Sequence, residues 1–104
     1  DDAAQTLKKG MQVATIQELN QYGRRLISQK KNKEAMDVFK FNLEKNPNKF
    51  APLVGMARGY SADGDYKTAL KYAKMAEPLA PDEANKKNII AIIETLKEGK
   101  DINQ

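Results

Sequence analysis

The sequence predicts an all-α fold built from helix–turn–helix pairs, and three observations support this prediction. Apolar residues recur at helical spacing along most of the chain, as at Leu53, Met56 and Tyr60. Residues that favour turns and helix starts, such as Gly64 and Asp65, separate these apolar stripes. A shift of 34 residues superimposes Leu19 on Leu53, Gly23 on Ala57, Arg24 on Arg58, Ala35 on Ala69 and Pro47 on Pro81. A period of this size is typical of stacked helix–turn–helix arrays.

The first part of the chain contains the signals for three helices. Residues 1–14 are expected to form a short N-terminal capping helix. Thr15 and Glu18 have the spacing of a capping box and predict a helix over about 16–29. A basic turn follows, and a second helix is expected over about 33–45. Asn46 and Pro47 end that helix, because the residue before a proline resists the α conformation.

The second part repeats this pattern more clearly. A helix is expected over about 50–62, with Pro52 in its first turn, where a missing N–H costs little. The next helix begins near 66 and is cut short by Pro78. A last helix follows Pro81 and ends near Gly99. The predicted organisation is one domain comprising an N-terminal helix (1–14), repeat 1 (16–49), repeat 2 (50–83), a capping helix (84–99) and a frayed tail (100–104).

Composition excludes several classes of function. The chain has 104 residues, 40% apolar and 31% charged, with a mean hydropathy of −0.72. No apolar run approaches the ~20 residues of a membrane span. Cys and His are absent, so thiol metal sites and the commonest general base are excluded. Ser28 and Ser61 have no recognisable base partner. We therefore expect no enzyme activity, no cofactor and no metal site.

The basic charge belongs mainly to one hairpin. The net charge is +4, and residues 24–49 carry eight Lys or Arg against three acids. These lysines could contact nucleic acid phosphates, but no aromatic residues are interleaved for base stacking. A solvated basic turn is the commoner explanation, so we expect no nucleic acid partner.

The two copies resemble tetratricopeptide repeats, in which large, small and aromatic residues recur through the first helix, a small residue recurs in the second and a proline closes the repeat. The second copy matches with Leu53, Ala57, Tyr60, Ala69, Ala76 and Pro81. The first matches with Leu19, Gly23, Ala35, Phe39 and Pro47. Leu26 replaces the usual aromatic residue, and Asn42 stands where a small residue is expected. A third copy keeps only its first helix, with Ile90 and Ala91 in register.

The resemblance implies a concave face lined by the first helix of each repeat. The residues that it places there are Gln17, Asn20, Arg24, Ser28, Val54, Arg58, Asn85 and Asn88, with Ala51 and Ala62 between them. Arg24 and Arg58 are equivalent positions, and two guanidinium groups so placed could hold an acidic peptide. The alternative is that both are solvated stems that cover apolar surface. The clamp for chaperone carboxylates found in some members of the family is not matched.

Glycines at positions 55 and 59 of one predicted helix also need an explanation, because each costs about 1 kcal/mol relative to alanine. A close approach of a ligand backbone or tight helix packing would account for them, and we favour packing.

Two interpretations of different class remain open. The chain is a peptide- or protein-binding module with a concave groove, or it is an assembly element. In the second interpretation an isoleucine-rich face of the last helix docks onto a second copy or onto an upstream domain of the parent protein. The residues of that predicted interface are Ile89, Ile92, Ile93 and Leu96.

The flanks add a second resemblance. The segments 19–23 and 96–103 are similar to the C-terminal tails of uncharacterised exported bacterial proteins, in which a β-rich domain precedes the repeats. This resemblance implies that the chain is an accessory domain of an exported, periplasmic parent protein, and that a start at Asp1 reflects excision or processing. The residues themselves do not decide the compartment.

Overall fold

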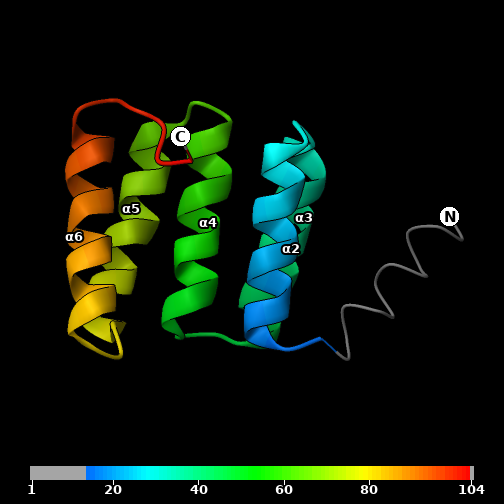
Figure 1. Ribbon diagram of the computed structural model, residues 1–104, viewed down its shortest axis with the longest axis horizontal. Coiled ribbons are helices and arrows are strands. Elements are labelled where there is room, and N and C mark those ends of the chain that lie inside the picture. The colour runs from blue at the N-terminus through cyan, green and yellow to red at the C-terminus, as the bar shows by residue number, and fades with distance from the viewer. Residues whose placement is uncertain (1–13, 104) are drawn as a thin grey trace, which may run out of the picture.

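The computed structural model describes residues 14–103, and this part of the chain is all-helical (Figure 1). It contains α2 (Ile16–Ser28), α3 (Asn32–Lys45), α4 (Phe50–Ala62), α5 (Tyr66–Ala76), a 3-10 turn η1 (Glu77–Leu79) and α6 (Glu83–Lys97). No strand occurs among these residues. The prediction of an all-α fold is confirmed. The predicted N-terminal helix over 1–14 falls almost entirely outside the described residues.

Local signals set the helix boundaries where the sequence predicts them. The capping box forms at the start of α2: the Glu18 amide donates to Thr15 Oγ1 (3.1 Å) and the Thr15 amide donates to Glu18 Oε1 (2.9 Å). Asp65 caps α5 by accepting from the Thr68 amide. Pro78 lies in the 3-10 turn that follows α5, so the predicted interruption occurs directly after Ala76.

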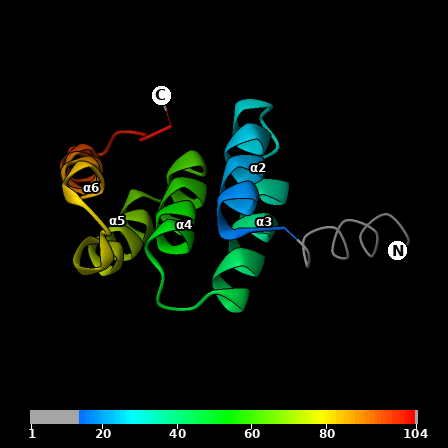
Figure 2. The same cartoon turned by 60° about the horizontal axis from the view of Figure 1, so that its bottom comes forward.

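The helices pack as successive antiparallel neighbours (Figures 1 and 2). α2 packs against α3, α4 against α5, and α5 against α6. The two pairs meet because α4 contacts both α2 and α3. As a result, α2 and α4 lie side by side although they are separated by a whole helix in the sequence.

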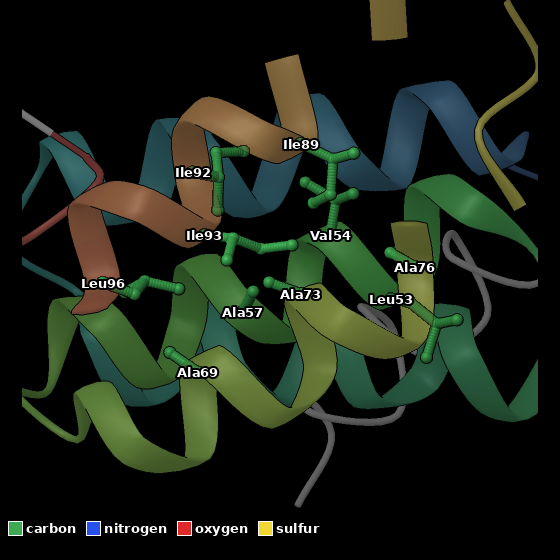
Figure 3. Close-up of a cluster of buried hydrophobic side chains, with 10 residues drawn as sticks. All are labelled: Leu53, Val54, Ala57, Ala69, Ala73, Ala76, Ile89, Ile92, Ile93 and Leu96. Atoms are coloured by element: carbon green, nitrogen blue, oxygen red, sulfur yellow. The ribbon is translucent and has the colours of Figure 1, made fainter. Parts of the chain in front are cut away.

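Two apolar clusters hold these helices together. The first joins α2, α3 and α4 and is built from Leu19, Leu26, Ala35, Met36, Val38, Phe39 and Met56. The second joins α4, α5 and α6 and is built from Leu53, Val54, Ala57, Ala69, Ala73, Ala76, Ile89, Ile92, Ile93 and Leu96 (Figure 3). Alanines on α5 leave room for the large side chains of α6, so these helices approach closely.

The predicted interface on the last helix is corrected by this second cluster. Ile89, Ile92, Ile93 and Leu96 are 0%, 6%, 6% and 3% exposed within the single chain. Their wide apolar surface is covered because they pack against α4 as well as α5 (Figure 3). These four residues therefore offer no exposed face to a second copy or to another domain.

The prediction of a frayed tail is also wrong for residues 101–103. The Ser61 hydroxyl donates to Asp101 Oδ1 (2.7 Å) and accepts from the Ile102 amide (2.9 Å). The Asn103 side chain donates to the Arg58 carbonyl (2.9 Å), and Ile102 packs against the second cluster. Ser61 is 1% exposed, so the tail supplies partners for a hydroxyl that α4 would otherwise bury alone.

Asn42 occupies the place where the repeat pattern expects a small residue, and hydrogen bonds explain how it is tolerated. Its side chain is fully buried. The amide nitrogen donates to the Ile16 carbonyl at 3.2 Å, and the amide oxygen accepts from Asn46 Nδ2 at 3.0 Å. The residue thus ties the start of α2 to the end of α3 instead of disrupting their packing.

Candidate functional site

A groove of about 420 Å³ runs along one side of α2 and α4 and reaches the start of α6. It is lined by Ile16, Gln17, Asn20, Arg24, Lys49, Phe50, Ala51, Val54, Arg58, Leu79, Pro81, Asn85 and Asn88. Eight of the ten residues that the resemblance placed on a concave face line this groove. The exceptions are Ala62 and Ser28, and the Ser28 hydroxyl donates to the Arg25 carbonyl while the residue lines a separate pocket at the end of α2.

The floor of the groove is apolar and its walls are polar. Val54 is only 5% exposed and belongs to the second cluster, so it contributes a fixed apolar surface. Phe50 and Ala51 lie beside it at the start of α4 and are half-buried. Gln17 and Asn88, on α2 and α6, are exposed at the two sides. This combination suits a segment that places apolar side chains inward and hydrogen bonds at its edges.

Cationic groups dominate the charge of the groove. Arg24, Lys49 and Arg58 line it, and none of the described residues that line it is acidic. No ion pair between described residues involves any of the three. Arg24 is exposed, whereas Arg58 is half-buried. The groove therefore presents positive charge that no ion pair between described residues neutralises.

The two arginines are close enough to influence each other. The pKa of Arg58 is lowered to about 10, mainly by burial and also by the nearby charge of Arg24, while the charge of Asp101 acts in the opposite direction. Arg58 remains protonated at neutral pH, so the guanidinium groups of Arg24 and Arg58 repel each other. An anion between them would relieve this repulsion and accept hydrogen bonds from both.

Two asparagines in the groove have different roles. Asn85 donates from its side chain to both carboxylate oxygens of Asp82, and its backbone amide donates to the same carboxylate. These hydrogen bonds are part of the N-terminal cap of α6. Asn20 is different, because its buried Oδ1 atom has no hydrogen-bond partner among the described residues. That atom would lie 2.7 Å from a Cβ placed on Gly55, so it points toward the backbone of α4.

Several lining residues were not predicted as site residues. Lys49 and Phe50 lie where the chain enters α4, and Leu79 and Pro81 come from the connection between α5 and α6. Residues in the connections and at the first position of a helix are not part of the repeated helical pattern, so that pattern did not predict them as lining residues. The position of Lys49 directly before a predicted helix was the available clue.

Residues 14–103 contain no group of three Asp or Glu side chains arranged to hold a metal ion. None of the described helices is long and apolar enough to cross a membrane. No protein-family model matches the chain, and neither the curated proteins nor the solved structures include a match.

Proposed function

We propose that this chain is a non-enzymatic module that binds a protein or peptide, and that an acidic segment of the partner lies in the groove between α2, α4 and the start of α6. The observation that supports this most directly is the pair of Arg24 and Arg58 over an apolar floor, with neither arginine in an ion pair between described residues. Helical grooves commonly recognise extended or helical segments through such side-chain pockets.

The same proposal includes a tetratricopeptide-like stack of about two and a half repeats. Two findings support it: α2 and α4 contact each other, and they carry equivalent residues 34 positions apart, as with Arg24 and Arg58. A repeat array brings equivalent residues of successive repeats to neighbouring positions on one face. The competing assembly role loses its support, because the isoleucine face that suggested it is buried in the chain's own core.

Charge reversal at Arg24 tests the function. Peptides selected from a random display library on the wild-type protein are expected to be enriched in Asp and Glu. Their dissociation constants should rise about tenfold or more in Arg24→Glu, because a favourable charge-assisted contact becomes a repulsion. The measurement is fluorescence anisotropy with labelled peptides, and affinity should also weaken at higher ionic strength.

Lys40→Glu is the matched control, because Lys40 is an exposed lysine on α3 that does not line the groove. This variant changes the net charge of the protein by the same amount as Arg24→Glu. It should leave the peptide affinity within about twofold of wild type, as expected for a distant, screened charge. Selected peptides without acidic enrichment, or equal effects of the two variants, would contradict the proposal.

A further inference from the structure

A second pocket, of about 450 Å³, lies at the end of the groove near the C-terminal turns of α2 and α4. We call it the end pocket. It is lined by Arg24, Arg25, Ile27, Ser28, Arg58, Ile102 and Asn103. The docked tail forms one of its walls through Ile102 and Asn103. Arg24 and Arg58 line both the groove and the end pocket, so the two are adjacent.

Three arginines line the end pocket, two from α2 and one from α4. None of the described residues that line it is acidic. Asp101 is an acid whose charge affects Arg58, and its Oδ1 already accepts from Ser61 Oγ, the Asn103 amide and Asn103 Nδ2. Asp101 therefore serves to fasten the tail, and the arginine cluster keeps an excess of positive charge.

The neutral donors around the end pocket are engaged within the chain. The Ser28 hydroxyl donates to the Arg25 carbonyl at 2.7 Å. The Asn103 side-chain amide donates to the Arg58 carbonyl and to Asp101. Arg58 Nη1 also donates to the Ile102 carbonyl at 3.5 Å, so the donors that remain to recognise a ligand are the guanidinium groups of Arg24 and Arg25 and the other N–H groups of Arg58. Their number and charge suit an anion with more than two acceptor oxygens.

We propose that the end pocket binds the phosphoryl group of a phosphorylated serine or threonine in the segment that occupies the groove. A phosphoryl group carries about −1.5 to −2 charge at pH 7 and three strong acceptor oxygens, whereas a carboxylate carries one charge and two oxygens. Arginine forks match the geometry of phosphoryl oxygens. The attachment to a segment rests on the proposed function, because the end pocket shares Arg24 and Arg58 with the groove.

The first test needs no knowledge of the partner. N-acetyl-phosphoserine amide and N-acetyl-glutamate amide are titrated into the ¹⁵N-labelled protein and followed by NMR. The phosphoserine compound should bind about tenfold more tightly, as expected for the additional charge and hydrogen bonds. Arg25→Gln should abolish that preference, because Arg25 lines the end pocket and not the groove. Equal binding of the two compounds, or a preference that survives Arg25→Gln, would overturn the proposal.

A second arm separates a phosphorylated segment from free phosphate. An acidic peptide selected on the wild-type protein is synthesised with each of its acidic residues replaced in turn by phosphoserine, and inorganic phosphate is titrated in parallel. At least one phosphopeptide should bind about tenfold more tightly than its parent and than inorganic phosphate. Inorganic phosphate that binds as well as every phosphopeptide would overturn the assignment to a segment.

Variants with opposite effects distinguish this proposal from the groove itself. Lys49→Gln should weaken binding of the parent peptide and leave the affinity for N-acetyl-phosphoserine amide unchanged, because Lys49 lines the groove and not the end pocket. Arg25→Gln should leave the affinity for the parent peptide unchanged and remove the gain in affinity that phosphorylation gives. A groove that binds acidic peptides without any Arg25-dependent gain would refute the phosphoryl site and leave the proposed function standing.

Discussion

At the scale of single residues, Phe39 explains the glycines of the first apolar cluster. Its ring lies against the backbones of two helices, where a Cβ placed on Gly23 or on Gly55 would collide with it. A Cβ on Gly59 would instead lie 2.6 Å from the terminal methyl group of Met36. Glycine thus occurs at these positions because the side chains of Phe39 and Met36 occupy the space that a Cβ would need. This supports the packing explanation favoured from the sequence.

The difference between these glycines gives a stability prediction. Gly23→Ala should lower the free energy of unfolding by about 2 kcal/mol, because the rigid Phe39 ring cannot yield easily and overpacking of this kind costs about 1–3 kcal/mol. Gly59→Ala should stay within about 1 kcal/mol of wild type, because the end of Met36 can move and alanine favours the helix. Urea unfolding measures both. A Gly23→Ala variant as stable as Gly59→Ala would contradict this account.

At the scale of elements, local signals and long-range packing contributed differently. The helix bounds were predictable because caps, prolines and apolar periodicity act within a few residues, as at Thr15 and Pro78. The burial of α6 was not predictable, because the apolar pattern of its isoleucines is the same whether they face solvent or two neighbouring helices. The docking of the tail was not predictable either, because Ser61 and Asp101 are distant in sequence and local sequence patterns do not predict their contact.

The tail yields a second stability prediction. Ser61→Ala should cost about 1 kcal/mol, because it leaves the Ile102 amide and the Asp101 carboxylate without their shared partner. Amide hydrogen exchange of Ile102 should accelerate in the variant. Ser28→Ala is the control: its exposed hydroxyl bonds within one turn, so the change should stay within about 0.5 kcal/mol.

Unchanged exchange of the Ile102 amide in Ser61→Ala would show that the tail does not depend on this hydroxyl. Rapid exchange of the same amide in the wild-type protein would contradict the docked tail itself.

At the scale of the whole molecule, the groove follows from the neighbouring positions of α2 and α4. Most of its predicted residues could be named from the sequence because the repeat resemblance assigns them to one face, and the 34-residue shift makes Arg24 and Arg58 equivalent positions on it. The lining residues that could not be predicted from the sequence come from the connections and the tail, such as Lys49 and Asn103. Their positions depend on how complete helix pairs meet, which periodicity within one helix does not encode.

Mapping a bound acidic peptide by NMR on the ¹⁵N-labelled protein tests the groove most directly. We predict saturable shifts at the amides of Asn20, Arg24, Arg58 and Asn88, with little change on the exposed faces of α3 and α5. Saturable shifts centred on α3 and α5, with α2 and α4 unaffected, would contradict the account.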